Sequence, residues 1–276
     1  MKKIVIITGA SSGMGAEFAR QLAGRKGIDE IWLMARRKER LEDLARELGR
    51  PERLRIIPGD ISGRKGGDLT ARQLKDAGGI VVDTVVNNAG FGVYGPFTGT
   101  NLQKQLDMID LNVQTLTAIT GAVLPYLAPG SRVINVASLA AFSAMGNFAV
   151  YAATKAYVLS FSLGLAAELE PAGIPVIALC PGPVDTEFSA VASGGVREKV
   201  LHGKPAKAVV AHCLACLERG KPIAVMSPKW KLKAFLPRLV SRLFAARFTL
   251  RHEARPSGFL GETTGGAFGG TARPRP

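Results

Sequence analysis

Residues 3–15 read KIVIITGASSGMG, and this stretch decides the fold. Lys3–Thr8 is a nearly continuous apolar run, the pattern of a strand that is covered on both faces. A glycine-rich turn follows and leads into a helical pattern containing Phe18 and Leu22. Glycines allow a tight turn, and a helix N-terminus offers free N–H groups, so this order predicts a pyrophosphate site. The residues expected to form it are Thr8, Gly9, Ser11, Ser12, Gly13, Met14 and Gly15. For the glycine string alone, an ordinary strand–helix turn is the alternative.

Short apolar runs continue to alternate with helical patterns along the chain. The clearest helix has Leu41, Leu44, Ala45 and Leu48 on one face and stops at Gly49. This alternation predicts an α/β fold: a single doubly wound Rossmann-type domain with a seven-stranded parallel sheet, over residues 1–228. The six further strands are expected at Glu30–Ala35, Leu54–Pro58, Asp83–Asn87, Arg132–Ala137, Pro175–Cys180 and Pro222–Met226.

Two arginines follow the second expected strand, at the position that selects the cofactor in such folds. A site that prefers NAD places an acid there, about 20 residues beyond the glycines, to bind a ribose hydroxyl. This chain has Arg36 and Arg37 instead, and no acid before Glu39. A guanidinium pairs well with a 2′-phosphate, which predicts NADP(H) as the cofactor. A solvated helix start is the alternative interpretation of both arginines.

A small group of polar residues suggests proton-transfer chemistry. Tyr151 and Lys155 are four residues apart at the start of a helical pattern, so they share one face. A nearby ammonium lowers the pKa of a phenol, whose reference value is about 10, and so favours phenolate. Ser138 comes directly after an expected strand, at the edge where open α/β sheets bind ligands. Asn112 lies in a long helical pattern, where a buried amide needs partners.

In this order, these motifs resemble those of the classical short-chain dehydrogenase/reductase family, over about residues 3–228. The resemblance implies that Tyr151 is the general acid/base, with Lys155 lowering its pKa and holding the nicotinamide ribose. Ser138 would polarise the substrate carbonyl, and Asn112 would support a proton relay through Lys155. The remaining cofactor contacts that it implies are Asp60 and Ile61 near the adenine, Asn87, Ala89 and Gly90 near the adenosine, and Pro181, Gly182, Val184 and Thr186 near the nicotinamide.

The implied activity is a reversible hydride transfer from NADPH to a ketone or aldehyde, with Tyr151 protonating the alkoxide. The substrate is expected to be apolar, because Phe91, Val93, Met145, Phe148 and Phe188 flank the motifs, although such residues are also common in cores. Two alternatives stay open: a reductase of 3-oxo acyl thioesters, and a regulatory protein that senses the cofactor. The resemblance also suggests a homodimer or a homotetramer.

Charge and cysteine content narrow the remaining possibilities. The net charge of the 276 residues is +14, yet no nucleic-acid motif accompanies it, so we expect no nucleic-acid partner. Three cysteines are too sparse for a secreted disulfide scaffold, and we expect Cys213 and Cys216 to be buried thiols. His202, His212 and His252 lack metal-ligand spacing, so no metal is expected. The short apolar start is not a signal peptide, and a cytoplasmic protein is expected.

Three segments differ from the alternating pattern. The resemblance marks residues 183–207 as a substrate lid.

The segment Lys229–Arg251 contains three Lys and four Arg with no acid. On a helical wheel drawn from Pro237 onward, one side carries Leu239, Val240, Leu243 and Phe244, and the opposite side carries Arg238, Ser241, Arg242 and Thr249. This composition is typical of an interfacial helix, so peripheral contact with an anionic membrane or an acidic partner is one interpretation. A helix packed on the protein's own surface is the other. Residues 252–276 are expected to be a mostly disordered tail.

Overall fold

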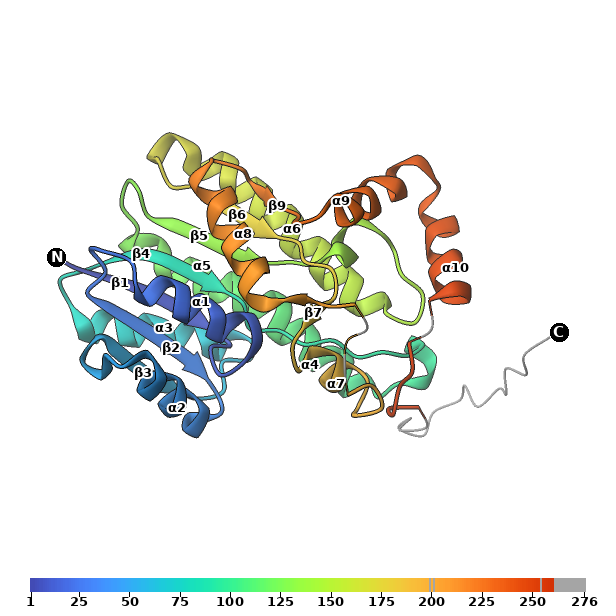
Figure 1. Cartoon of the computed structure of the whole chain (residues 1–276), viewed down its shortest axis with the longest axis horizontal. Coiled ribbons are helices and arrows are strands. Elements are labelled where there is room, and N and C mark those ends of the chain that lie inside the picture. The colour runs from blue at the N-terminus through green and yellow to red at the C-terminus, as the bar shows by residue number, and fades with distance from the viewer. Residues whose placement is uncertain (199, 201, 254, 261–276) are drawn as a thin grey trace.

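The computed structural model describes residues 1–198, 200, 202–253 and 255–260 (Figure 1). In this part of the chain, a seven-stranded parallel sheet has the order β3-β2-β1-β4-β5-β6-β9. The predicted sheet is confirmed, and each strand lies where the apolar runs placed it, with ends that differ by up to three residues. The strands are β1 (Lys2–Thr8), β2 (Glu30–Ala35), β3 (Leu54–Pro58), β4 (Ile80–Asn87), β5 (Arg132–Val136), β6 (Val176–Leu179) and β9 (Ile223–Ala224).

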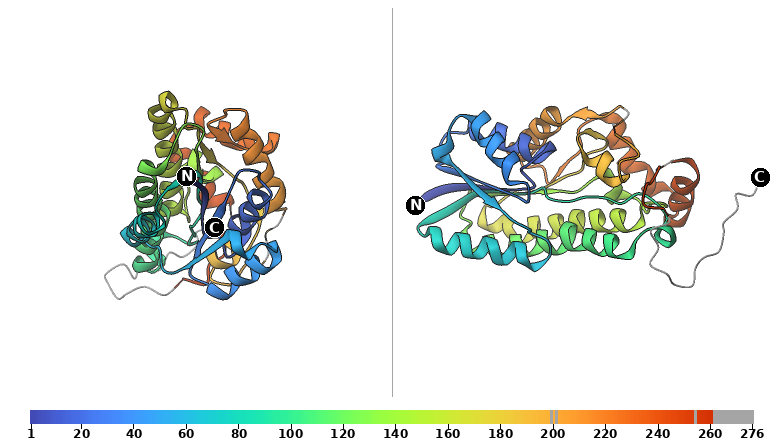
Figure 2. Two further views of the ribbon diagram at one scale, coloured as in Figure 1. Left: turned by 90° about the vertical axis from the view of Figure 1, so that its left-hand side faces the viewer. Right: turned by 90° about the horizontal axis from the view of Figure 1, so that it is seen from below.

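Helices cover both faces of the sheet (Figure 2). One layer consists of α1 (Gly13–Ala23), α2 (Lys38–Leu48) and α8 (Ala206–Glu218). The other consists of α3 (Arg64–Ala77), α4 (Leu102–Ile109), α5 (Leu116–Val123) and α6 (Ala149–Leu169). Short 3₁₀ turns connect several elements: Pro51–Arg53, Phe97–Gly99, Leu124–Tyr126, Leu139–Phe142 and Glu170–Ala172.

Successive side chains of the central strands enter opposite cores, which explains why the strands read as continuous apolar runs. In β1, Val5 and Ile7 pack in the core beneath α1, while Ile4 and Ile6 pack in the core beneath α3 and α5. All four are completely buried. A strand covered on both faces cannot alternate apolar with polar residues, since either face would then bury a polar group.

The strand order reverses between β1 and β4, and this reversal locates the ligand crevice. In doubly wound sheets, ligands bind beyond the carboxyl ends of the strands at such a switch point. The loop Gly9–Met14 follows β1, and Asn88–Gly90 follows β4, so both loops emerge at the same edge. The loops after β5 and β6 emerge beside them.

The expected lid segment has little regular structure of its own. It contains β7 (Val184–Asp185), α7 (Phe188–Ala192) and β8 (Lys204–Pro205), and the two strands pair in parallel. Tyr94 N donates to Ala192 O at 2.7 Å, which connects α7 with the loop after β4.

The helical wheel drawn from Pro237 onward is wrong, because the chain forms two helices there. Helix α9 (Pro228–Phe235) runs into a 3₁₀ turn, Leu236–Leu239, and Val240 is extended. A new helix, α10 (Arg242–His252), begins where the Ser241 side chain accepts a hydrogen bond from Phe244 N at 3.2 Å. Pro237 lacks an N–H and Ser241 is a good N-cap, so the two residues together end one helix and start another.

The expectation of a disordered tail is also wrong for residues 255–260. Arg255 Nη1 donates to Gly146 O at 3.1 Å, and Gly258 N donates to Ser193 O at 2.8 Å. The segment therefore contributes Arg255 and Phe259 to the cavity wall, and it is anchored by contacts with residues more than 60 positions away in the sequence. Residues 261–276 lie outside the described residues.

Helix α6 is long and apolar enough to cross a membrane by length and composition alone; it is the single such helix in the described residues. It packs against β6 and carries buried Tyr151, Thr154 and Lys155 on its inner face. We therefore assign α6 to the core of the domain.

Candidate active site

The glycine turn after β1 is built for close approach of its backbone to a ligand. Gly9 and Gly13 have positive φ angles of 67° and 54°, which residues that carry a Cβ rarely adopt. A Cβ on Gly15 would lie 2.2 Å from Gly9 O, so only glycine allows the turn to close under α1. The predicted phosphate loop therefore has the required form, and five of its residues line the large cavity: Gly9, Ser11, Ser12, Gly13 and Met14.

Thr8 and Gly15, by contrast, do not line the cavity and support the loop from behind. The Thr8 hydroxyl donates to Val86 O at 3.2 Å and accepts from Asn88 N at 2.9 Å and Ala89 N at 3.0 Å. Asn88 Nδ2 returns a hydrogen bond to Thr8 O at 3.0 Å. Asn88 faces the cavity, although the sequence analysis had not selected it.

The Asn87 side chain points into the layer between the sheet and α5, away from the cofactor side that the resemblance implied. Its Nδ2 donates to Thr120 Oγ1 at 3.0 Å and to Asn135 Oδ1 at 2.9 Å. Asn135 in turn donates to Ser162 Oγ on α6 at 3.0 Å. Asn87 therefore connects β4, α5 and β5 beneath the site, while Ala89 and Gly90 line the cavity.

The two arginines after β2 are placed differently. Arg37 lies over the glycine turn, where its Nη2 donates to Ser12 Oγ at 2.8 Å and to Ser11 Oγ at 3.2 Å. Its Nη1 pairs with Glu187 at 2.9 Å, and Arg40 pairs with the same carboxylate. Arg36 is exposed in the cavity, and no hydrogen bond or ion pair joins it to another described residue. The structure therefore leaves one guanidinium open at the position predicted for a 2′-phosphate.

Glu187 belongs to the expected lid, so its two ion pairs cross the cleft. Next to it, Thr186 rests on the glycine turn: a Cβ on Gly13 would lie 3.1 Å from Thr186 Cγ2. The arginine pairs hold the pKa of Glu187 below its usual value, although burial acts in the opposite direction as the largest single influence. The segment after β6 is thus fastened to both sides of the nucleotide crevice.

Ser138 follows β5 and caps the short 3₁₀ turn Leu139–Phe142. Its Oγ accepts from Ala140 N at 3.1 Å, which leaves the hydroxyl proton free to be donated. Leu139 N donates to Pro181 O at 2.9 Å, so this turn is joined to the loop after β6.

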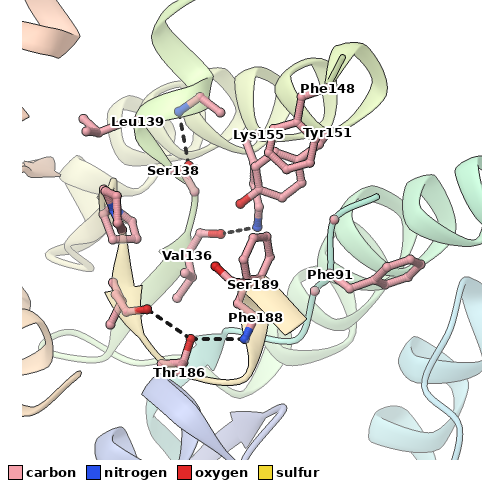
Figure 3. A pocket seen from close by; sticks show the side chains of 18 of the residues that line it. Phe91, Val136, Ser138, Leu139, Phe148, Tyr151, Lys155, Thr186, Phe188 and Ser189 are labelled. Atoms are coloured by element: carbon pink, nitrogen blue, oxygen red, sulfur yellow. Dashed lines mark hydrogen bonds between the residues drawn. The ribbon is translucent and has the colours of Figure 1, made fainter. Parts of the chain in front are cut away.

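Tyr151 comes from the first turn of α6 and lies beside Ser138 in the cavity (Figure 3). Its ring stacks on Phe148 with centroids 4.1 Å apart and lies 5.5 Å from Phe188. The phenol is buried, and burial raises its pKa above the ordinary value, while a hydrogen bond with Ser138 acts in the opposite direction. The net lowering expected from Lys155 is therefore not found in the protein alone, because burial has the larger effect.

Lys155 lies one helical turn beyond Tyr151, with its Nζ 5.7 Å from the centroid of the Tyr151 ring. The Nζ donates to Val136 O at 2.8 Å, at the end of β5. Burial lowers the pKa of Lys155 to about 8. At neutral pH the ammonium form still predominates, but a small change in surroundings would shift it.

Asn112 lies behind this group, in a π-helical turn, Asp110–Thr115, between α4 and α5. Its Oδ1 accepts from Phe91 N at 3.0 Å, and its Nδ2 donates to Phe91 O at 2.9 Å and to Thr154 Oγ1 at 3.1 Å. A Cβ on Gly90 would lie 2.7 Å from Asn112 Oδ1 and 3.4 Å from Lys155 Nζ. Asn112 is therefore adjacent to Lys155 but does not line the cavity.

All these loops surround one cavity of about 2180 Å³. Of the predicted site residues outside the glycine turn, it brings together Arg36, Arg37, Asp60, Ile61, Ala89, Gly90, Ser138, Tyr151, Lys155, Pro181, Gly182, Val184 and Thr186. Hydrogen bonds from Ser62 lower the pKa of Asp60, so this carboxylate is charged and able to accept from an amino group.

The wall opposite the glycine turn is apolar and aromatic. Tyr94 meets Phe148 edge to face at 4.7 Å, and the Arg255 guanidinium, which also lines the cavity, lies 5.3 Å from the centroid of the Phe148 ring. Tyr94 and Arg255 were not predicted, because no local sequence pattern marks them. The apolar residues of this wall are Phe91, Val93, Tyr94, Leu139, Met145, Phe148 and Phe188.

Comparison with known proteins agrees with this geometry. The sequence model of the family described as short chain dehydrogenase matches residues 3–194. Sulfoacetaldehyde reductase 2 of Chromohalobacter salexigens is 36% identical over 202 residues, covering 71% of this chain and 78% of that protein. Among solved structures, a short-chain dehydrogenase from Sphingobium yanoikuyae in complex with NADPH is similar, with 29% identity and a TM-score of 0.72, covering 92% of this chain and 96% of that one.

A further solved structure concerns bulky substrates. The bulky-bulky ketone specific alcohol dehydrogenase from Comamonas testosteroni has 26% identity and a TM-score of 0.69, covering 91% of this chain and 98% of that one. A nucleotide-dependent oxidoreductase is the class that this fold and these matches define. The chain belongs to the short-chain dehydrogenase/reductase family.

The buried ammonium of Lys155 makes stability depend on pH. In the unfolded chain this group titrates near its ordinary value of 10.5, and in the folded protein near 8, so the unfolded state binds more protons between these values. The contribution of Lys155 to the unfolding free energy therefore rises with pH between these two values. We expect this effect in the protein without added cofactor. As pH rises from 8 to 10.5, the unfolding free energy of wild type should increase by up to about 3 kcal/mol relative to that of the Lys155→Met variant.

The measurement is urea unfolding at several pH values between 8 and 10.5. Lys75→Met removes an exposed ammonium from α3 and serves as the control, with a constant difference from wild type expected. A difference between wild type and Lys155→Met that does not change with pH would show that Lys155 is charged throughout.

Proposed function

We propose that this protein is an NADP(H)-dependent oxidoreductase that interconverts a carbonyl compound and an alcohol, with Tyr151 as the acid/base. The observation that carries the proposal is the meeting of Ser138, Tyr151 and Lys155 on one wall of the cavity, beside the glycine turn. These residues come from the loop after β5 and from α6, and a purely structural role would not require their polar groups at the ligand edge.

The glycine turn fits a dinucleotide. Gly9 and Gly13 expose backbone at positive φ, and the N-terminus of α1 lies directly behind them. The positive end of the helix and its free N–H groups suit a pyrophosphate. Gly90 leaves the space in front of Lys155 open, where a Cβ would collide with Asn112. In this proposal, Arg36 would hold the 2′-phosphate, Asp60 the adenine and Lys155 the nicotinamide ribose.

The cofactor, when bound, supplies or accepts the hydride, and the protein handles the proton. Tyr151 is protonated at neutral pH because burial raises its pKa, so it is ready to donate to the oxygen of a carbonyl that is being reduced. The Ser138 hydroxyl can hydrogen-bond that same oxygen and orient it. The Lys155 ammonium favours the phenolate that remains, since the two groups lie within one helical turn.

Asn112 acts through the backbone in this proposal. Its amide holds Phe91 N and O together and supports Thr154, so it fixes the loop after β4 against α6 near Lys155. The relay role implied by the family resemblance would need a hydrogen-bonded path between Lys155 and Asn112, and Asn112 Oδ1 already accepts a hydrogen bond from Phe91 N. Asn112 is therefore proposed as a positioning residue.

The aromatic wall favours an apolar carbonyl substrate. Phe148 and Phe188 pack against the Tyr151 ring, and Tyr94 packs edge to face on Phe148. The carbonyl compound would lie against these rings while its oxygen meets Ser138 and Tyr151. A 3-oxo acyl thioester fits the same chemistry and remains the alternative within this class. A panel of carbonyl compounds should include a small anionic aldehyde as well, because a relative is named for reducing sulfoacetaldehyde.

Two further proposals concern assembly and class. The homodimer or homotetramer implied by the resemblance could use the exposed apolar residues Leu102, Leu106 and Leu163 on α4 and α6. A regulatory protein that only senses the cofactor would need no Ser138, Tyr151 and Lys155 in the cavity. Oxidation of NADPH with a carbonyl panel separates an enzyme from such a sensor.

Tyr151→Phe should lower kcat/KM roughly 100- to 10,000-fold, because the proton donor is lost while the ring still packs on Phe148. NADPH affinity should change little. Tyr157→Phe is the control: it lies on the same helix, and its hydroxyl contacts Thr117 at 2.9 Å on the outside. Steady-state NADPH oxidation and fluorescence titration of NADPH measure the two quantities. Turnover near the wild-type rate in Tyr151→Phe would refute the acid/base assignment.

Arg36→Asp should weaken NADPH binding roughly 10- to 100-fold and improve the relative use of NADH, through a lost charged hydrogen bond and a new repulsion at the 2′-phosphate. The test is the ratio of kcat/KM for the two cofactors. Arg72→Asp on α3 makes the same charge change on an exposed side chain and should leave the ratio unaltered. The idea fails if wild type prefers NADH.

Glu187→Gln should favour NADPH over NADH by up to about fivefold, since Arg37 and Arg40 are then free to face a 2′-phosphate. The ratio of the two dissociation constants isolates this charge effect, because a looser lid would weaken both cofactors alike. Glu47→Gln, which breaks a surface pair with Arg20, is the matched control. An unchanged ratio would show that the 2′-phosphate lies away from Arg37 and Arg40.

A further inference from the structure

Residues 228–251, here called the arm, carry exposed large apolar side chains at a much higher density than the rest of the described residues. The arm contains α9, the turn Leu236–Leu239 and α10, and it lies at the end of the molecule beyond the carboxyl edge of the sheet (Figures 1 and 2). Nine of the nineteen exposed large hydrophobic residues among those described belong to it, with exposed fractions of 42% to 66%. They are Leu232, Phe235, Leu236, Leu239, Val240, Leu243, Phe244, Phe248 and Leu250. A concentration of this kind marks an interaction surface.

The arm is firmly attached to the domain by a few small contacts. Trp230 packs over the loop after β6, where a Cβ on Gly182 would lie 2.4 Å from the indole. Gly146 N donates to Thr249 Oγ1 at 3.0 Å, and a Cβ on Gly146 would lie 2.5 Å from Leu250 Cβ. Trp230, Ala234, Ala245 and Thr249 are the buried residues of the arm. Its inner side is thus fixed, and its outer apolar side chains have no cover among the described residues.

Positive charge surrounds these apolar residues. Lys229, Lys231, Lys233, Arg238, Arg242, Arg247 and Arg251 are all exposed. No ion pair joins any of the seven to a described residue, and the sequence has no acid between Glu218 and Glu253. Half of the net charge of +14 therefore lies on the surface that also carries the exposed hydrophobics.

This combination selects among the partners that could cover the arm. A second copy docked by two-fold symmetry would bring the same seven cations against themselves. The residues after 260 contain a single large apolar side chain, Phe268, which is too little to cover nine. An anionic bilayer satisfies both features, because its headgroups attract the cations and its acyl region accepts the hydrophobics.

We propose that the arm docks the protein on an anionic lipid bilayer, with the mouth of the active-site cavity toward the lipid. Helices of 8 and 11 residues are too short to cross the hydrocarbon core, so the arm lies in the interface. Leu236, Leu239, Val240, Phe244 and Phe248 are both exposed and part of the cavity wall. The apolar surface of the arm therefore extends from its exposed side into the cavity, between the cations Lys229 and Lys233 that also line it.

The continuity of this surface names the substrate class, and this step rests on the proposed function. A carbonyl compound dissolved in the bilayer could pass along the arm to Tyr151 without entering water. The substrate is thus a membrane-partitioned ketone or aldehyde, such as a long-chain or polycyclic one. Small soluble carbonyls would reach the same cavity but gain nothing from the membrane.

Vesicle co-sedimentation of the full chain tests the docking. Wild type should bind vesicles of phosphatidylcholine and phosphatidylglycerol at low salt. It should bind much less to vesicles of phosphatidylcholine alone, and much less to either kind at high salt. The triple variant Arg238→Gln, Arg242→Gln, Arg247→Gln should lower the partition coefficient about 100-fold, at about fivefold for each charge. None of these three residues lines the cavity. The matched control removes three charges from α3: Arg64→Gln, Arg72→Gln and Lys75→Gln.

The apolar contribution is tested by Leu232→Ser, Phe235→Ser and Leu243→Ser, with Leu102→Ser, Leu106→Ser and Leu163→Ser on α4 and α6 as the control. The arm variant should lose vesicle binding, and the control should keep it. A single variant, Leu243→Cys, labelled with a fluorophore that reports polarity, should shift to the blue on anionic vesicles. The native cysteines Cys180, Cys213 and Cys216 are buried, and Leu163→Cys provides the reference position.

Several outcomes would overturn the docking proposal: wild type left in the supernatant with anionic vesicles at low salt, arm and control variants that bind equally, or a label at 243 that does not respond. Arm variants that change the oligomeric mass but not vesicle binding would identify a contact between copies instead.

Activity provides a separate readout of the substrate class. Both arm variants should keep wild-type turnover of a soluble carbonyl and lose at least tenfold in the rate with a carbonyl embedded in anionic vesicles. Equal rates with the embedded substrate would overturn the proposed substrate route. If none of the carbonyl compounds tested supports NADPH oxidation by wild type, but wild type still binds vesicles, the proposed function fails and the docking proposal stands.

Discussion

The hydroxyl of Thr8 is the contact on which the site depends. It joins the end of β1 to the backbone of Val86, Asn88 and Ala89, across the point where the strand order reverses. Because of this contact, the glycine turn after β1 and the loop after β4 leave the sheet side by side. Asn88 returns the connection through its own amide. The glycine turn and the loop after β4 are therefore joined by one buried hydroxyl that does not itself line the cavity.

A second constraint is the burial of Tyr151 and Lys155. The same loss of solvent raises the pKa of Tyr151 and lowers that of Lys155, since each effect disfavours the charged form. Without a bound cofactor, the pair is thus biased toward a neutral phenol beside an ammonium that is easily deprotonated. A hydrogen bond with Ser138 opposes this bias at Tyr151. The neutral phenol therefore keeps its proton inside the cavity, beside the Ser138 hydroxyl.

Much of the fold and of the catalytic group could be predicted from the sequence, because local patterns determine them. Apolar runs located all seven strands, and the spacing of Tyr151, Lys155 and Ser138 placed these residues in one cavity. The failures have physical reasons. Side-chain periodicity alone predicts one helix from Pro237 onward, but Pro237 and Ser241 divide this segment into a 3₁₀ turn and a separate helix. Tight backbone contacts to Gly146 and Ser193 order residues 255–260, whose composition suggests disorder.

The contacts that sequence reasoning could not find are those between distant segments. Glu187 meets Arg37 across 150 positions, and Tyr94 and Trp230 reach the cavity from loops and helices with no motif of their own. The pKa of Tyr151 belongs here too. The spacing to Lys155 shows that an ammonium is near, but only the assembled cavity shows that burial has the larger effect.

The proposed entry route along the arm requires exposed apolar side chains on the protein surface. Exposed hydrophobic side chains also favour self-association. The seven cations oppose this, because any two arms that meet repel each other. Leu243 and Phe244 lie beside Arg242 on α10, so cations and exposed hydrophobics are intermixed there. In the docking proposal, this intermixing opposes contact between two arms at the apolar mouth of the cavity.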